Sequence, residues 1–215
     1  MTTTHIVLIR HGETAWNAER RLQGHIDIAL NAEGVRQADA LANALAGEHF
    51  DAIYASDLQR AHQTAQSIAK RQGMLVHADP GLRERCYGGF EGLLYAEIEQ
   101  RFPRQFAAWQ ARDIDSVMPS GVREAESFRQ FYRRCTDAIV AIAARYPGRK
   151  LALVAHGGVL ECAYRAALSL SLETPRDFPV MNASINRFSV QDGVLALASW
   201  GDVAHLKRGV LDELG

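Results

Sequence analysis

Two short apolar runs stand out from the alternation of hydrophobic and polar positions along the chain. Residues 6–9 and 151–155 are continuously apolar, which favours buried strands of a parallel sheet over half-exposed strands. The first run leads into Arg10, His11 and Gly12, and the second leads into His156 and Gly157. Because open α/β sheets hold their ligands at the ends of such strands, we interpret the two strand ends as halves of one site.

The remaining pattern alternates between helical and extended periods. Asn31 is a suitable N-cap for an amphipathic helix that Gly47 closes, and Gly73 stops a second helix. Asp192 and Gly193 separate two apolar runs, which is a strong hairpin signal, so we expect a mixed sheet. The expected helices are 32–46, 58–71, 123–145 and about 159–170, and the expected further strands are 52–54, 75–77, 184–190 and 194–200.

Two segments are less regular. Residues 14–30 are polar and turn-rich and directly follow a strand end, which is typical of a functional loop. Between residues 93 and 119, a helical period at Ile98, Phe102, Phe106 and Trp109 is interrupted by Pro103. We therefore predict a lid or side subdomain of short helices at about 93–122, within one domain that spans residues 1–215.

Composition and charge narrow the class of protein. Apolar residues make up 47% of the 215 positions, enough for a sizeable core, and 24 basic against 25 acidic side chains give a net charge of -1. Bulk charge thus argues against a nucleic-acid or membrane-surface partner. No stretch reaches the roughly 18 apolar residues of a membrane helix, and residues 1–5 lack the features of a signal peptide. Cys86, Cys135 and Cys162 are widely spaced, so we expect reduced thiols, no metal site and a cytoplasmic location.

Five side chains at or near strand ends suggest a common chemistry. Arg10 and Arg60 offer planar, two-pronged groups suited to phosphate, and His11 or His156 can attack phosphorus near neutral pH. Glu84, in an irregular segment after a strand, can protonate the departing alkoxide. Backbone amides at Gly12 and at the Gly157-Gly158 pair can approach the same anion. The pattern predicts a phosphoryl-transfer site.

Each of these residues also has a plainer interpretation when taken alone. Isolated histidines are most often packed or surface residues, and we apply that interpretation to the other six histidines. Arg60 alone would be a solvated helix residue, and Glu84, between two arginines, would be half of a surface ion pair. Asn17 and the Gln23-Gly24 pair could be simple turn formers. The repeated strand-end context is what favours a functional role for His11 and His156.

Sequence blocks along essentially the whole chain point to a known family. The first block is Leu8 to Thr14 with Trp16 and Asn17. The later blocks are RRLQG at 20–24, LNAEG at 30–34, SDLQRA at 56–61 with Thr64, LRE at 82–84, AHGG at 155–158 and NASI at 182–185. In this order and spacing they resemble the histidine phosphatase superfamily, with its phosphoglycerate mutase-like fold. The resemblance implies a three-layer α/β sandwich, with helices on both faces of a mostly parallel, mixed sheet and a small helical lid.

The resemblance also implies a role for each matching residue. His11 would be the nucleophile that becomes phosphohistidine, and Glu84 would be the proton donor and later the base. His156 would help to hold the transferring phosphoryl group. The phosphate- and substrate-binding residues would be Arg10, Asn17, Gln23, Gly24, Arg60, Tyr87 and Gly157. No metal is implied, because arginine and histidine side chains supply the positive charge that magnesium supplies elsewhere.

Members of this superfamily are either phosphatases or mutases. Residues 84–88 resemble the mutase form, apart from Cys86 where a histidine is usual. Against this, the chain is short, and after Trp109 it has Gln110, Ala111 and Arg112 instead of consecutive arginines. Loss of charge-assisted contacts worth roughly 1.5–3 kcal/mol each would weaken retention of a bisphosphorylated intermediate. The sequence favours a phosphomonoester hydrolase, with a phosphoglycerate mutase dependent on 2,3-bisphosphoglycerate as the alternative.

A catalytically silent phospho-ligand binder on the same fold is a third hypothesis. Both the nucleophile and the acid are present, which disfavours it. The expected partner is a small phosphorylated metabolite, and the expected assembly is a monomer or a homodimer. The sequence leaves the identity of the metabolite open.

Overall fold

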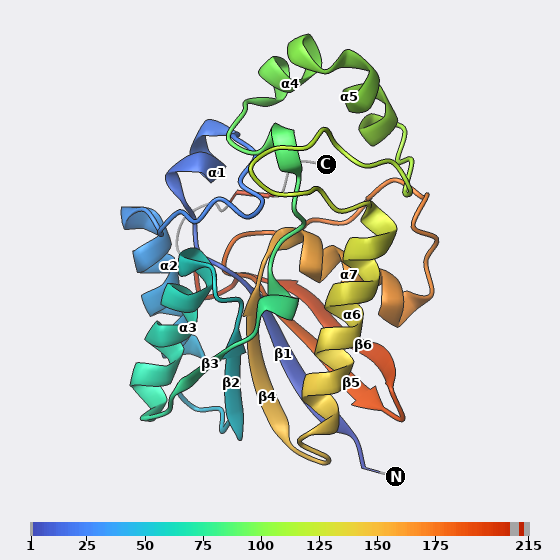
Figure 1. Ribbon diagram of the computed structural model, residues 1–215. Helices are drawn as coiled ribbons and strands as arrows, with labels where there is room; N and C mark the ends of the chain where they lie inside the picture. Colours follow the sequence, from blue (N-terminus) through green and yellow to red (C-terminus); the bar gives the residue numbers. More distant parts are fainter. Residues whose placement is uncertain (1, 207–210, 213–215) are drawn as a thin grey trace.

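A six-stranded mixed sheet forms the centre of the protein in a computed structural model that describes residues 2–206, 211 and 212 (Figure 1). The strand order is β3-β2-β4-β1-β5-β6. The first four strands in that order run parallel, and β5 and β6 add antiparallel pairs at one side. The strands are β1 (Thr4–Arg10), β2 (Ala52–Ala55), β3 (Val76–Ala78), β4 (Lys150–Ala155), β5 (Ile185–Gln191) and β6 (Val194–Asp202).

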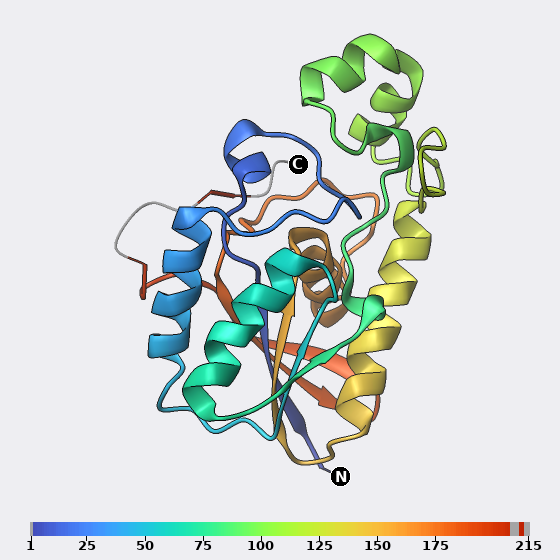
Figure 2. The same ribbon diagram turned by 60° about the vertical axis from the view of Figure 1, so that its left-hand side comes forward.

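Helices cover both faces of this sheet, as the expected three-layer α/β sandwich requires (Figure 2). On one face α2 and α3 pack against each other, and on the other face α6 and α7 pack together. The helices are α1 (Ala15–Glu19), α2 (Ala32–Ala44), α3 (Gln59–Gln72), α4 (Tyr95–Arg101), α5 (Pro103–Gln110), α6 (Phe128–Ala144) and α7 (Gly157–Leu168). Two short 3-10 turns lie at Pro80–Leu82 and Gly88–Phe90.

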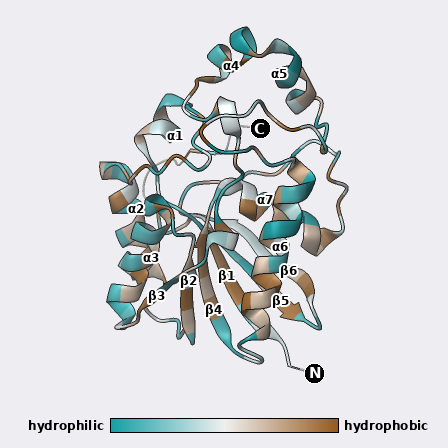
Figure 3. Ribbon diagram, viewed as in Figure 1, coloured by the Kyte–Doolittle hydropathy of each residue, from teal (hydrophilic) through white to brown (hydrophobic). Residues whose placement is uncertain are grey.

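The apolar run of β1 explains why this strand lies near the middle of the sheet. Ile6 and Leu8 point to the core under α6 and α7, while Val7 and Ile9 point to the core under α2 and α3. Successive side chains of a strand face opposite sides, so a strand buried on both sides has to be apolar at every position. Figure 3 shows the hydrophobic colouring concentrated on the strands and the inner helix surfaces.

A third, smaller core lies away from the sheet, beneath α4 and α5. Phe90, Ile98 and Met118 are buried there, with aromatic side chains such as Trp109 packed against them. Pro103, which breaks the helical period, begins α5 at its first turn, where a missing N–H costs nothing. Two short helices therefore occupy the segment in which the sequence predicts them.

Helix boundaries differ from the predicted ones in several places. The helix expected at 123–145 begins at Phe128, because Ser127 and Gln130 form a capping box that fixes its first turn. The helix expected to reach residue 46 ends at Ala44, and its Val35 is 49% exposed instead of facing the core. The short helix α1 lies in the segment predicted as a loop, where Thr14 and Asn17 cap it reciprocally.

Turn chemistry is predicted more accurately than helix starts. Asn31 caps α2 through a hydrogen bond from the Gly34 N–H, and Gly73 ends α3 in the left-handed conformation. Asp192 and Gly193 have φ values of 52° and 79°, so they form the expected tight hairpin between β5 and β6. No helix in the described part of the chain combines the length and apolar character needed to cross a membrane.

The close approach of α2 to the end of β1 generates a stability prediction. A Cβ at Gly34 would lie 2.0 Å from the Glu13 carbonyl oxygen, which is a backbone atom and cannot easily move aside. Alanine normally stabilises a helix relative to glycine by about 1 kcal/mol. Here Gly34→Ala is expected to destabilise the protein by about 1–3 kcal/mol instead, measured by urea unfolding.

The matched control is Gly47→Ala. Among the described residues, nothing would lie within 4 Å of a Cβ at Gly47. The control is expected to change the free energy of unfolding by less than about 0.5 kcal/mol. Stabilisation by Gly34→Ala would contradict the close packing of α2 on the strand end.

Candidate active site

The ends of the adjacent parallel strands β1 and β4 bring His11 and His156 together. Arg10 is the register partner of Ala155, and the His11 N–H donates to the Ala155 carbonyl at 3.0 Å. The backbone leaves the sheet after each of the two strands, and the two imidazole rings meet edge to face with centroids 5.1 Å apart. The two strand ends predicted to form one site therefore do so.

The backbone around His11 fixes its tautomer. Its Nδ1 lies 2.7 Å from the Gly12 carbonyl oxygen, which can only accept a hydrogen bond, so Nδ1 carries the proton. In the neutral ring the lone pair is then on Nε2. Burial, followed by the charges of Arg60 and Arg10, lowers the pKa of His11 well below its usual value. The ring is thus neutral at physiological pH and able to act as a nucleophile.

His156 is fully buried at the N-terminus of α7. Neither of its ring nitrogens has a hydrogen-bond partner among the described residues. Its pKa is also lowered well below the usual value, first by burial and then by the charge of Arg60. A buried polar group that lacks partners is costly, so these nitrogens are suited to a polar ligand in the site.

Two buried arginines complete the positive side of the site. Arg10 and Arg60 are each 1% exposed. The Arg10 guanidinium donates to the Val180 carbonyl, and that of Arg60 donates to the carbonyls of Ile26 and Gly24 at 3.0 and 2.7 Å. These bonds to backbone oxygens fix the direction of both side chains. This arrangement is suited to a phosphoryl group.

Glu84 enters the site from another direction, between the two 3-10 turns. Its Oε1 accepts from the Arg85 N–H at 2.7 Å, and its Oε2 accepts from the Gly158 N–H at 3.0 Å. A Cβ at Gly158 would lie 2.2 Å from Oε1, so only glycine leaves room for the carboxyl group at this point. The amide of Gly158, which was expected to approach the anion, bonds the acid instead.

One small cavity of about 40 Å³ joins these groups. It is lined by all the predicted site residues except His156 and Gly157. Asn17 caps α1, and the Gln23 side-chain oxygen accepts a hydrogen bond from the Thr14 hydroxyl. Gly24 has a φ angle of 52°, and its carbonyl accepts a hydrogen bond from Arg60. Tyr87 lines both this cavity and a neighbouring one of about 230 Å³. Gly157 is buried directly after His156, and its contact with a ligand stays a prediction.

Several supporting residues are absent from the sequence-based set of site residues. Thr64, one turn after Arg60, accepts from the Gly12 N–H at 3.1 Å. Asn182 donates to the His11 carbonyl at 3.0 Å from just before β5. The cavity is also lined by Trp16, Arg20, Arg21 and Tyr95. Both Thr64 and Asn182 belong to the sequence blocks that resemble the family, and that resemblance is the signal by which they could have been included.

The described residues contain no cluster of three or more histidine, cysteine or acidic side chains that could hold a metal ion. The cationic groups at the site are instead arginines. Arg10 and Arg60 lie beside the two histidines, and Arg20 and Arg21 line the outer part of the cavity. The arrangement offers a candidate nucleophile, a candidate acid and positive charge around a volume that is suited to a phosphoryl group.

Comparison with known families identifies the class of protein. The model of the histidine phosphatase superfamily (branch 1) matches residues 6–203. The chain therefore belongs to the histidine phosphatase superfamily, and the resemblance seen in its sequence blocks is confirmed. Members of this superfamily are phosphatases or mutases.

Individual relatives carry both kinds of name. The chain is 40% identical over 206 residues to phosphoglycerate mutase-like protein 4 of Arabidopsis thaliana, covering 94% of this chain and 87% of that protein. It is 39% identical over 205 residues to a metal-independent phosphoserine phosphatase of the same plant, covering 94% and 83%. A solved phosphoserine phosphatase of Entamoeba histolytica, in complex with 3-phosphoglyceric acid, superimposes with a TM-score of 0.82 at 27% identity, covering 94% and 98%.

The buried neutral histidines generate a prediction about stability and pH. In the unfolded chain His11 and His156 take up a proton below about pH 6.5, whereas in the folded chain they stay neutral. The unfolded state then binds more protons, so the free energy of unfolding is expected to fall as the pH drops from about 6.5 to about 5. Each histidine contributes a slope of at most about 1.4 kcal/mol per pH unit.

Urea unfolding of the ligand-free protein at several pH values measures this slope. The double variant His11→Asn, His156→Asn is expected to have a clearly smaller slope. His25 and His205, whose pKa values burial also lowers, account for a remaining part. An unchanged slope in the double variant would mean that the two imidazoles are not held neutral in the folded protein.

Proposed function

We propose that the protein is a metal-independent phosphomonoester hydrolase that acts on a small phosphorylated metabolite through a phosphohistidine intermediate. The observation that carries the proposal is the state of His11. Its Nδ1 proton is held by the Gly12 carbonyl, its Nε2 carries a lone pair, and two buried arginines and His156 lie beside it. The names of the relatives support the same class of activity.

In the first step the Nε2 lone pair of His11 attacks phosphorus, and the bond from phosphorus to the ester oxygen breaks. Glu84, in its protonated form, donates a proton to that oxygen, so the product leaves as a neutral alcohol. Arg10 and Arg60 stabilise the charge on the phosphoryl oxygens, and a ring N–H of His156 donates to one of them.

In the second step a water molecule replaces the product alcohol. The Glu84 carboxylate removes a proton from this water, its oxygen attacks phosphorus, and the bond to Nε2 breaks. Inorganic phosphate leaves, His11 regains its lone pair, and Glu84 is protonated again. No electron carrier or metal ion enters either step.

The surroundings of the lid arginines favour hydrolysis over a mutase reaction. Arg112 forms an ion pair with Glu161 at 2.7 Å, and Arg101 lies 4.0 Å from Glu97. Among the described residues, neither lines the cavity that contains His11 and Glu84. Arg112 lines the neighbouring cavity, but its charge is already paired with Glu161, which disfavours retention of the second phosphate that a mutase has to hold.

The phosphoglycerate mutase alternative has one observation in its favour. Arg20 and Arg21 line the outer part of the cavity and could bind a second anionic group. That reaction would need 2,3-bisphosphoglycerate to load the histidine. We rank it second, because Arg21 is already bonded to Glu19 and to the Gly92 carbonyl.

The proposal extends to the lid and to the place of action. We propose that residues 93–122 of this single domain form the lid over the substrate, since α5 and Tyr87 border the larger cavity beside the site.

Phosphoserine and 3-phosphoglycerate are the first substrates to test, because one relative is named for phosphoserine and one solved structure holds 3-phosphoglyceric acid. Three free, buried cysteines support action in the cytoplasm.

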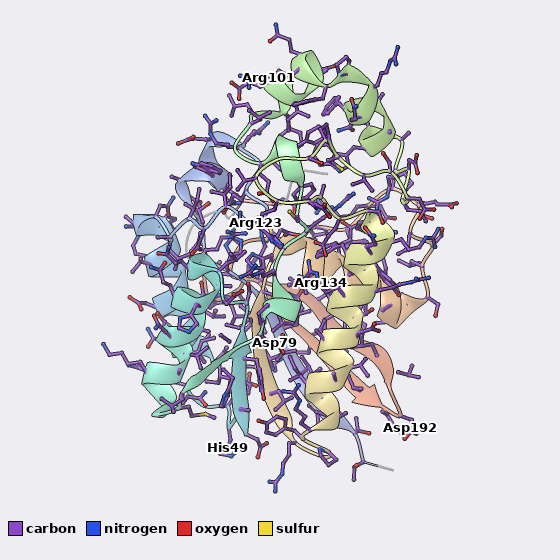
Figure 4. All side chains as sticks on the ribbon, viewed as in Figure 1. His49, Asp79, Arg101, Arg123, Arg134 and Asp192 are labelled. Atoms are coloured by element: carbon purple, nitrogen blue, oxygen red, sulfur yellow. The ribbon has the colours of Figure 1, made fainter. Side chains whose placement is uncertain are left out.

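The nucleophile is tested by His11→Ala. This change is expected to lower turnover of phosphomonoesters by at least about 10³-fold, because it removes the nitrogen that is proposed to carry the phosphoryl group. Mass spectrometry after acid-free quenching is expected to find one added phosphoryl group on the native protein and none on the variant. The control is His49→Ala at the opposite end of the sheet, labelled in Figure 4, which should keep native turnover. Comparable turnover in His11→Ala would refute the proposed mechanism.

The reaction type is tested by phosphorus NMR with phosphoserine or 3-phosphoglycerate, a trace of 2,3-bisphosphoglycerate, and EDTA. Inorganic phosphate is expected to accumulate at the rate measured without the chelator, because arginines supply the positive charge. Growth of 2-phosphoglycerate with a constant phosphate signal would establish the mutase instead. A rate that falls in EDTA and recovers with a divalent metal would contradict the metal-independent mechanism.

A further inference from the structure

The segment that carries Glu84 has little regular structure of its own. Residues 83–87 lie outside the helices and strands of the described chain, between two 3-10 turns. Backbone ladders therefore do not determine where the Glu84 side chain points. An acid that has to meet a leaving oxygen within hydrogen-bond reach needs another source of precision, since an error of about 1 Å can cost about 10²-fold in rate.

Arg134 of α6 supplies this support from behind the segment. Its Nη1 donates to the carbonyls of Gly81 and Arg83, both at 3.0 Å, and its Nη2 donates to the Glu84 carbonyl at 3.0 Å. Its Nε and Nη2 also bind the two carboxylate oxygens of Glu126 at 2.6 and 2.8 Å. All five N–H donors of the guanidinium are thus used, three of them on the backbone around Glu84. Figure 4 labels Arg134 on α6.

Glu126 fastens the other end of the same segment. Its carboxylate accepts from the Cys86 N–H at 2.9 Å, and its own N–H donates to the Cys86 carbonyl at 2.9 Å. Burial tends to raise the pKa of Glu126, but its bonds to Arg134 lower it overall, so the group is ionised. The ion pair and its backbone bonds enclose residues 81–86 on both sides of Glu84.

We propose that the Arg134–Glu126 ion pair is a positioning device for the general acid, an inference that rests on the proposed function of Glu84. The pair fixes the backbone of the segment, and the Gly158 N–H then aims the carboxyl group. Among the described residues Arg134 does not line the cavity, so its contacts with the site run through the backbone of the Glu84 segment. His25, whose Nε2 lies 2.7 Å from the Glu84 carbonyl, holds the same peptide from the opposite loop.

The leaving group of the substrate distinguishes positioning of an acid from general support of the fold. An alkyl alcohol needs a proton to leave, whereas p-nitrophenolate leaves without one. Arg134→Met is therefore expected to slow phosphorylation of His11 by an alkyl phosphate about 10- to 100-fold. Phosphorylation by p-nitrophenyl phosphate is expected to stay within about 3-fold of the native rate.

The rate to measure is the single-turnover formation of phosphohistidine by rapid quench, which excludes the later hydrolysis step. The alkyl ester is whichever of phosphoserine, 3-phosphoglycerate and glycerol phosphate the native protein cleaves fastest. The matched control is Arg129→Met on the same helix. Arg129 also binds a carboxylate through two bonds, to Asp115 at 2.7 and 2.9 Å, but this pair is exposed and makes none of the bonds that Arg134 makes to residues 81–86. The control should leave both rates unchanged.

A double variant shows whether Arg134 works through Glu84. In a Glu84→Gln background, Arg134→Met is expected to cause no further loss with the alkyl ester. Equal losses with both esters, or full additivity with Glu84→Gln, would overturn the proposal and leave Arg134 a purely structural residue. Arg134→Lys is expected to rescue little, because an ammonium group cannot make the forked contacts.

Folding of the variants is checked by thermal unfolding. If Arg134→Met does not fold, Glu126→Gln provides the same comparison of the two esters, since it removes the charge but keeps the shape of the partner. Failure of the proposed function looks different: the native protein would then form no phosphohistidine with either ester. If Glu84→Gln itself left the alkyl rate unchanged, the acid would be misassigned, and the role of Arg134 would fall with it.

Discussion

The parallel pairing of β1 with β4 is the interaction on which the rest of the site depends. The pairing sets Ile9 opposite Val154 and Arg10 opposite Ala155, so the residues that follow both strands lie side by side. Both strands are buried on two faces, and a slip of one residue would exchange the side chains of the two cores. The apolar packing of the whole sheet therefore fixes the position of His11 relative to His156.

Placing these residues at the ends of β1 and β4 excludes water from the arginine and imidazole groups. Arg10, Arg60, His11 and His156 are almost completely buried, and the pKa values of both histidines are lowered as a result. Electrostatic interactions are stronger in such surroundings than in water. Prearranged positive charge and a neutral imidazole in such a site are the features on which the proposed transfer of a phosphoryl group to His11 depends.

Glu84 and His11, the proposed acid and nucleophile, are positioned by different kinds of interaction. Sheet register determines the place of His11, whereas Glu84 lies on an irregular segment that Arg134 of α6 and Glu126, two residues before α6, enclose. The Gly158 amide joins the two parts, because it belongs to the helix that follows His156 and bonds the Glu84 carboxyl group. A change in α6 can therefore reach the acid without disturbing the nucleophile. Of the two short helices next to this segment, α5 borders the larger cavity through Trp109 and Gln110.

The sequence by itself determined the strand ends, the hairpin at Asp192-Gly193 and most of the residues around the cavity. Apolar runs, turn residues and the family blocks are local signals, and here they agree with the fold. The starts of α6 at Phe128 and of α1 at Ala15 follow from local capping pairs that the sequence-based prediction missed. Only the tertiary structure decided that Gly158 bonds Glu84. The residues around Arg134 in the sequence do not indicate its contacts, because it binds carbonyl groups about 50 residues earlier in the chain. Contacts of this range follow from packing, which a pattern along the chain does not encode.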